Sequence, residues 1–266
     1  MNTDARLIAF ERLLNVMDDL REKCPWDQKQ TNETLRQLTI EETYELSDAI
    51  LKNEPNLIKE ELGDLLLHIV FYAKIGSEKE SFDITSIINT LCDKLIFRHP
   101  HIYAKTSDHK ELIEVTSEED VKKNWEKLKL KEGRKSILEG VPSSMPAMNK
   151  AYRIQEKVKQ VGFEWETKEE VWGKFEEEIN ELKEAIHTNE HIEEELGDVF
   201  FSLINYARFI QIDPDAALEK CNTKFMNRFN YIERKAKQLN KNLSEMTLAE
   251  MDSYWNEAKL DEKNTK

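Results

Sequence analysis

Residues 41–49 read EETYELSDA, and residues 60–64 read EELGD. The same spelling returns later in the chain, as EEINELKEA over residues 177–185 and EELGD over residues 194–198. In all four segments acidic residues recur three apart, with apolar residues between them. Residues three apart share one face of an α-helix. The segments therefore predict two pairs of helices, each pair carrying an acidic face.

Three further features repeat in the same order behind the acidic segments. They are a Tyr-Ala-cation segment, a Lys-x-x-x-Arg pair and a tryptophan that is followed by a lysine four residues later. The matched positions are residues 72–74 with 206–208, Lys94 and Arg98 with Lys224 and Arg228, and Trp125 with Trp255. This ordered repetition indicates that the chain is a tandem duplication.

The composition favours helices throughout. Among 266 residues there are only 7 Gly and 6 Pro, too few for a loop-rich β protein, while 35% of the residues are charged. Apolar residues recur at helical spacing in most segments, so we expect an all-α fold of two tandem helical bundles. The predicted helices are 6–21, 34–51, 57–75, 85–97, 147–161, 169–188, 192–211, 214–240 and 248–259, with a further pattern that turns helical within 109–129.

The best candidate for a linker is residues 133–146, which concentrate Gly133, Gly140, Pro142 and Pro146. We therefore predict an N-terminal domain over residues 1–132 and a C-terminal domain over residues 147–266.

Charge and cysteine content limit the partners. A net charge of −14 argues against a nucleic-acid polymer as partner, and no apolar run is long enough to span a membrane. The three cysteines form no CxxC pair and are odd in number, which favours reduced thiols in a cytoplasmic protein.

The acidic segments predict metal sites. If the helices of each pair pack antiparallel, four carboxylates converge in each half. They are Glu42, Glu45, Glu61 and Asp64, and Glu178, Glu181, Glu195 and Asp198. Four anions in one cleft repel one another, and a divalent cation relieves that repulsion. Oxygen ligands alone suit Mg²⁺, or Mn²⁺, better than zinc or copper.

Two other interpretations compete with this one. A Glu-x-x-Glu helix is most often a solvated acidic face. A ferritin-like di-iron site needs Glu-x-x-His on two helices, and only Glu184 with His187 has that spacing. Gly63 and Gly197 favour a built site, because a helical glycine costs about 1 kcal/mol relative to Ala. Their place between the acids predicts that another backbone approaches closely there.

The Lys-x-x-x-Arg pairs place two cations on one helix face, where like charges are mildly unfavourable without a partner. A phosphate chain would be a suitable partner, although each pair could equally be a surface pair beside acidic neighbours. Trp125 and Trp255 could stack on a base or pack in a helical core.

Taken together, these segments resemble MazG-type nucleoside triphosphate pyrophosphohydrolases over nearly the whole chain. The resemblance is carried by CPWDQKQT (24–31), EETYELSDA, EELGDLLLHIVFYAK (60–74), KLIFRHPHIYA (94–104), residues 141–165, EEINELKEA, EELGD and KFMNRF (224–229). It implies an all-α fold assembled through homodimer contacts, Mg²⁺ dependence, and cleavage of nucleoside triphosphates to monophosphate and pyrophosphate by activated water.

Carried across by position, the resemblance implies that the eight acids named above are metal ligands, with Glu178 and Glu181 as catalytic residues. The substrate-binding residues it implies are Lys174, Glu177, Lys224, Arg228 and Trp255 in the second half, and Lys94, Arg98 and Trp125 in the first. Lys174 has Leu38 as its counterpart, so we predict that the C-terminal site is the main catalyst. The competing hypothesis is a non-catalytic helical module that binds nucleotide or metal.

Overall fold

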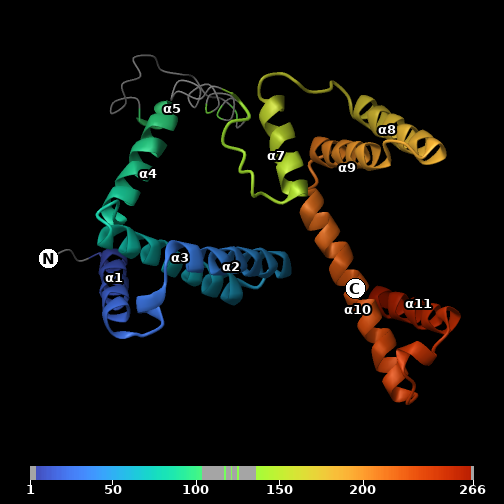
Figure 1. The fold of residues 1–266 in the computed structure, drawn as a ribbon, viewed down its shortest axis with the longest axis horizontal. Coiled ribbons are helices and arrows are strands. Elements are labelled where there is room, and N and C mark those ends of the chain that lie inside the picture. Colours follow the sequence, from blue (N-terminus) through green and yellow to red (C-terminus); the bar gives the residue numbers. More distant parts are fainter. Residues whose placement is uncertain (1–3, 104–116, 118–120, 122–124, 126–135, 265–266) are drawn as a thin grey trace. The chain divides into compact units, whose positions relative to one another are not determined.

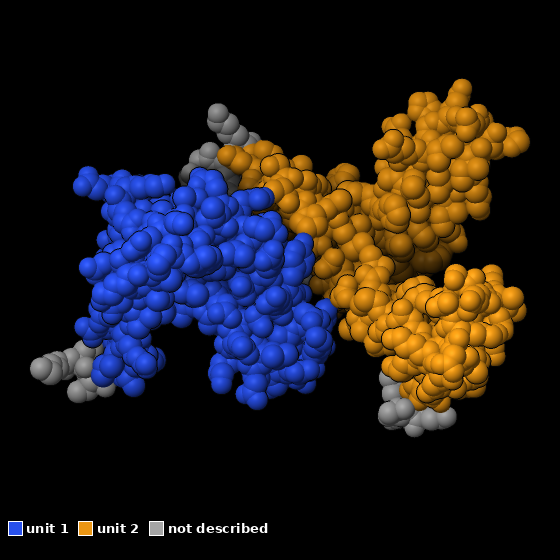
Figure 2. Space-filling model, turned by 60° about the horizontal axis from the view of Figure 1, so that its bottom comes forward, with its two compact units in different colours: residues 1–120 blue, residues 121–266 orange. Residues whose placement is uncertain are grey.

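The computed structural model describes residues 4–103, 117, 121, 125 and 136–264, and this part of the chain contains helices and no strand (Figure 1). The chain divides into two compact units, Met1–Asp120 and Val121–Lys266 (Figure 2). The predicted all-α class is confirmed. The predicted domain limits at residues 132 and 147 stay a prediction, since residues 126–135 lie outside the described part.

Unit 1 is built around the hairpin of two long helices. Its elements are α1 (Ala5–Lys23), the 3-10 turn η1 (Asp27–Lys29), α2 (Asn32–Lys52), α3 (Pro55–Glu78), α4 (Ile84–Arg98) and α5 (Pro100–Tyr103). Helices α2 and α3 pack along each other, and α1 packs on α3. The buried core of this unit is Met17, Leu35, Val70, Phe71 and Ile75.

Local signals set the α2–α3 hairpin. Thr31 and Thr34 form a capping box that begins α2, and Asn53 ends the helix in the left-handed region with φ 54°. Pro55 then occupies the first turn of α3, where its missing N–H costs no hydrogen bond. The turn is two residues long, so the acidic faces of the two helices run side by side.

Unit 2 repeats this plan. Its elements are α7 (Ala147–Lys159), α8 (Lys168–Thr188), α9 (Ile192–Phe209), α10 (Pro214–Gln238), the 3-10 turn η2 (Leu243–Glu245) and α11 (Leu248–Asn264). Helices α8 and α9 form the second hairpin, and α7 packs on α9 as α1 packs on α3. Beyond α9, α10 runs away from these three helices, and α11 folds back against α10 (Figure 1). Ile232, Ala236 and Met246 form the apolar core between them.

The predicted helices agree with the observed ones to within a few residues. Three end earlier than predicted because the chain adopts a positive φ soon afterwards, at Gly162 (87°), Gln211 (61°) and Asn240 (52°). The helical pattern within residues 109–129 lies outside the described residues, apart from Ser117, Val121 and Trp125. Among the described helices none is long and apolar enough to cross a membrane.

Candidate metal centres and a groove between two helices

The α2–α3 hairpin brings three carboxylates together. Glu42 of α2 and Glu61 and Asp64 of α3 each offer an oxygen, and these oxygens lie within 4.8 Å of one another. All three residues are half-buried. This group, the first cluster, matches the oxygen-only ligand set that a hard divalent cation prefers. Glu45 lies outside the group, and its role as a ligand stays a prediction.

The carboxylates of the first cluster oppose one another's ionisation. Loss of solvent, followed by the charges of Asp64 and Glu45, raises the pKa of Glu42. The pKa of Glu61 is likewise raised by loss of solvent and then by the negative charges of Glu45 and Glu42. A cation placed between these groups would remove this repulsion. Glu45 therefore contributes to the field of the cluster although it stands outside the closest group.

The α8–α9 hairpin forms the corresponding second cluster. Glu178, which is buried, and Glu181 and Glu195 offer oxygens that again lie within 4.8 Å of one another. Asp198 is exposed and outside this group, so its ligand role also stays a prediction. Each hairpin thus brings together three of the four acids that spacing suggested.

A lysine accompanies the second cluster. The Nζ atom of Lys174 lies 2.8 Å from Glu178 Oε1 and 2.8 Å from Glu177 Oε1. Hydrogen bonds to Glu177 and Glu178 raise the pKa of Lys174 well above its ordinary value. At the equivalent position of unit 1, Leu38 packs against the apolar core instead. The second cluster therefore has a built-in counter-ion at a position where the first has a hydrocarbon side chain.

The predicted cation pairs stand on other helices than the acidic cluster of the same unit. Lys94 and Arg98 lie on α4, which leaves the C-terminal end of α3, whereas Glu61 and Asp64 lie in its N-terminal half (Figure 1). In unit 2, Lys224 and Arg228 lie on α10, and neither belongs to the second cluster. Within each unit, the acids and the cations stand on different helix pairs.

Helices α10 and α11 enclose a groove of about 870 Å³. Three cations line it along one face of α10, namely Lys220, Lys224 and Arg234, together with Asn227. Asp261 and Glu262 of α11 form part of the opposite wall. Pockets of this size accommodate nucleotide-sized ligands, and the amide of Asn227 adds both a donor and an acceptor.

Arg228 lies beside this groove and contacts the predicted tryptophan. Its guanidinium carbon is 5.4 Å from the centroid of the Trp255 ring, and its Nη2 donates to Glu262 Oε2 at 2.6 Å. The Nε atom lies 3.1 Å from both oxygens of Glu262, so the carboxylate holds Arg228 as a fork. Sequence reasoning missed Glu262, although its place two helical turns after Trp255 put both residues on one face of α11.

Trp125 is the predicted counterpart of Trp255 in the first half. Its side chain is half-buried, and the residues on both sides of it lie outside the described part of the chain. Its contact with substrate stays a prediction.

The prediction of a close backbone approach at the two helical glycines is wrong for the chain alone. A methyl group added at Gly63 or Gly197 would meet no atom within 4 Å. The reason is that no other described element covers these helix faces. Leu62 and Leu196, the residues just before the glycines, are exposed as well.

Exposed apolar side chains continue from the glycines along several helices. They include Leu62, Leu66 and Ile69 on α3, Ile88, Leu91 and Leu95 on α4, Leu196, Phe200 and Leu203 on α9, and Leu218, Phe225 and Met226 on α10. Apolar stripes at helical spacing in an exposed position are typical of surfaces that another molecule covers.

Comparisons with known proteins show a family whose model matches the chain in two segments. The family model of the MazG nucleotide pyrophosphohydrolase domain matches residues 30–103 and 166–232, which hold the α2–α3 and α8–α9 hairpins. A "nucleoside triphosphate pyrophosphohydrolase/pyrophosphatase MazG" from Thermotoga maritima is 42% identical over 95% of this chain and 96% of that protein. A "nucleoside triphosphate pyrophosphohydrolase" from Escherichia coli K12 is 36% identical over 95% of this chain and 98% of that protein. A crystal structure of a mazG-related protein from Thermotoga maritima is 29% identical, covers 45% of this chain and 98% of that one, and has a TM-score of 0.39.

Proposed function

Because this chain belongs to the MazG nucleotide pyrophosphohydrolase family, we propose that it hydrolyses nucleoside triphosphates to nucleoside monophosphates and pyrophosphate with Mg²⁺. The observation that carries the proposal is the convergence of three carboxylates in each hairpin, which suits a hard divalent cation. Mn²⁺ fits the same oxygen donors. A bound cation would neutralise phosphate charge and make a water molecule a better nucleophile.

We assign separate roles in this reaction to residues of the second half. Glu178 and Glu195 would hold the cation. The pKa of Glu181 is raised by loss of solvent and then by the charge of Glu178, which suits a group that accepts the proton of the attacking water. Lys224 and Arg228 would bind phosphate oxygens, and this requires Arg228 to exchange Glu262 for the substrate.

We further propose that the enzyme is a homodimer in which each site is shared between two copies. Within unit 2, the second cluster stands on α8 and α9, whereas Lys224 and Arg228 stand on α10. The exposed apolar stripes of α9 and α10 supply surface for a second copy. A partner's α10 packed over α9 would bring the cations to the acids and would also cover Gly197.

Product analysis tests the reaction. Purified protein is incubated with a panel of nucleoside triphosphates and Mg²⁺, and pyrophosphate and orthophosphate are quantified separately. We expect pyrophosphate and monophosphate in equal amounts, and none with EDTA. Orthophosphate as the first product would overturn the reaction, and a panel of several bases would establish the substrate preference.

Complementation tests the shared site. Glu178→Gln and Arg228→Ala are prepared separately and then mixed under conditions that allow subunit exchange. Because half of the randomly formed dimers carry one intact site, we expect about a quarter of the wild-type activity to return. Activity that stays at the level of the separate variants would show that each site belongs to one chain.

We place the enzyme in the cytoplasm, because Cys24, Cys92 and Cys221 are all free thiols. Nucleoside triphosphates rather than a nucleic-acid polymer fit its net charge of −14.

A further inference from the structure

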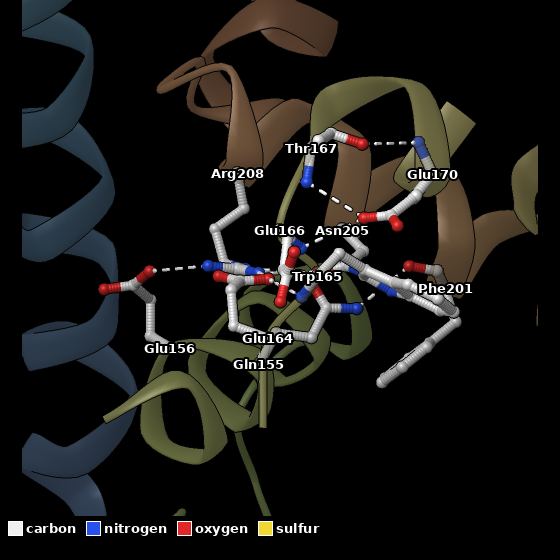
Figure 3. A network of polar contacts seen from close by, with 10 residues as sticks. All are labelled: Gln155, Glu156, Glu164, Trp165, Glu166, Thr167, Glu170, Phe201, Asn205 and Arg208. Atoms are coloured by element: carbon white, nitrogen blue, oxygen red, sulfur yellow. Dashed lines mark hydrogen bonds and ion pairs between the residues drawn. The ribbon is translucent and has the colours of Figure 1, made fainter. Parts of the chain in front are cut away.

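Arg208 is a buried cation of α9 that belongs neither to the second cluster nor to the groove. Its side chain is 2% exposed. The Nη2 atom donates to Glu164 Oε1 at 2.7 Å and to Asn205 Oδ1 at 2.8 Å, and Nη1 lies 3.4 Å from Glu156 Oε1 (Figure 3). A guanidinium removed from water needs such acceptors, so these contacts fix its position.

These contacts fasten separate segments to one point of α9. Glu156 belongs to α7, and Glu164 belongs to the loop that leads from α7 to α8. A second connection reinforces the first, since Gln155 Nε2 donates to the carbonyl oxygen of Phe201 at 2.9 Å. The loop that precedes α8 is therefore held against α9 through Arg208.

The loop determines where α8 begins. It ends at Thr167, whose side chain caps α8 and whose N–H donates to Glu170 Oε2 at 3.0 Å. From this point α8 runs along α9 as one continuous helix, so this start and the short turn after Thr188 together set the register of α8 against α9. That register decides whether Glu178 and Glu181 reach Glu195.

At the position equivalent to Arg208, unit 1 has a more exposed ion pair. Lys74 stands at the position equivalent to Arg208 and pairs with Asp18 of α1 at 2.6 Å. The two side chains are 30% and 61% exposed, and a lysine cannot form a fork.

Unit 1 fastens the loop before α2 from another helix. Arg21 of α1 forks onto Glu78 of α3 at 2.8 and 2.9 Å. It also donates to the carbonyl oxygens of Asp27 and Gln30. The second copy therefore differs in having its buried network centred on α9.

We propose that Arg208 is a positioning residue for the C-terminal site, holding the start of α8 so that the second cluster keeps its cation-binding geometry. The inference rests on the proposed function, because it takes the second cluster to be a metal site. Arg208 touches neither metal nor substrate and acts only through the register of α8. Groups that hydrogen-bond directly to metal ligands typically change metal affinity 10- to 100-fold when replaced, and for Arg208, which acts through α8, we expect an effect at the lower end of that range.

The test titrates the full-length protein with Mn²⁺ alone, and EPR measures how much Mn²⁺ is bound. A Glu42→Gln background weakens the first cluster, so that the remaining tight binding reports on the second. In that background we expect Arg208→Met to weaken Mn²⁺ binding about 10-fold and Arg208→Lys to weaken it less. Lys74→Met is the matched control in the same background and should leave the affinity unchanged.

Kinetics separate positioning from general instability. In Arg208→Lys, excess Mn²⁺ should restore kcat, and KM for the nucleotide at saturating metal should stay at its wild-type value. If circular dichroism shows that Arg208→Met is unfolded, Glu164→Gln takes its place, because it removes one partner charge and retains an acceptor.

Unchanged Mn²⁺ affinity in folded Arg208→Lys and Glu164→Gln would overturn the inference while leaving the hydrolysis intact. Equal weakening by Lys74→Met would also overturn it. A different result would overturn the proposed function alone. In that case the wild-type protein binds Mn²⁺ and Arg208→Met weakens this binding as expected, but the wild-type protein releases no pyrophosphate.

Discussion

The first and second clusters stand on equivalent helical hairpins, yet different side chains lie one turn before their leading acids. Lys174 pairs with Glu178 in the second cluster, whereas Leu38 packs into the core beside the first. The second cluster is therefore partly neutralised by its own chain, while the corresponding position beside the first cluster carries no charge. The third acid differs as well, since it is Asp64 in the first cluster and Glu181 in the second. These differences predict unequal roles.

The largest expected effect separates the two clusters directly. Glu178→Gln should lower the rate of pyrophosphate release by about 100-fold or more, because it removes a charged ligand from the site that also holds a lysine. Glu42→Gln should lower the rate only a few-fold. Both variants are assayed at saturating Mg²⁺ and nucleotide. Equal losses, or a greater loss in Glu42→Gln, would show that the C-terminal site is not the main catalyst.

Replacing Lys174, the side chain that distinguishes the second cluster from the first, tests the difference between the two clusters. Lys174→Leu makes the second cluster resemble the first and should raise KM for the nucleotide about 10-fold, because a charge-assisted contact to phosphate is lost. It should also increase the thermal shift that Mg²⁺ produces, since the carboxylates then lack their counter-ion. The reciprocal variant Leu38→Lys is the control. A KM that does not move would remove Lys174 from the substrate site.

A smaller effect concerns stability without metal. Glu61→Gln removes one of the repelling charges of the first cluster and should slightly raise the melting temperature of the metal-free protein. The same change should abolish the stabilisation of unit 1 by Mg²⁺. Thermal unfolding in EDTA and in Mg²⁺ measures both effects. A lower melting temperature in EDTA would mean that Glu61 makes a stabilising contact that outweighs the repulsion.

The smallest expected effect is a pH dependence confined to unit 1. Burial lowers the pKa of His68, whose equivalent in unit 2 is Ser202. A folded-state pKa below the unfolded value means that the native state prefers the neutral ring, so this stability is present at neutral pH and is lost as the pH falls below about 6.5.

The variant His68→Ser isolates this contribution. Wild-type protein should lose more stability than His68→Ser when thermal unfolding is compared between about pH 7.5 and about pH 5.5. Parallel losses in the two proteins would assign the acid sensitivity to other groups.

Local sequence was sufficient for the helices and for the acidic face of each hairpin. The acids three apart that meet in a cluster are Glu61 with Asp64 and Glu178 with Glu181. The capping residues Thr31 and Thr167 mark where α2 and α8 begin. These features depend on neighbours a few residues apart, so periodicity and end signals contain them. The MazG resemblance, carried by the same segments, is confirmed by the comparisons.

Residue spacing could not predict which residues of different helices lie close together. Three features depend on the directions that α4, α10 and α11 take after their turns. They are the placement of Arg228 on another helix than the second cluster, the open faces at Gly63 and Gly197, and the fork between Arg228 and Glu262. The sequence by itself determined the two acidic hairpins, because each is a local helical repeat closed by a short turn. Only the tertiary structure decided which cations stay apart from them and which acids meet, because helix packing joins residues that no local periodicity relates.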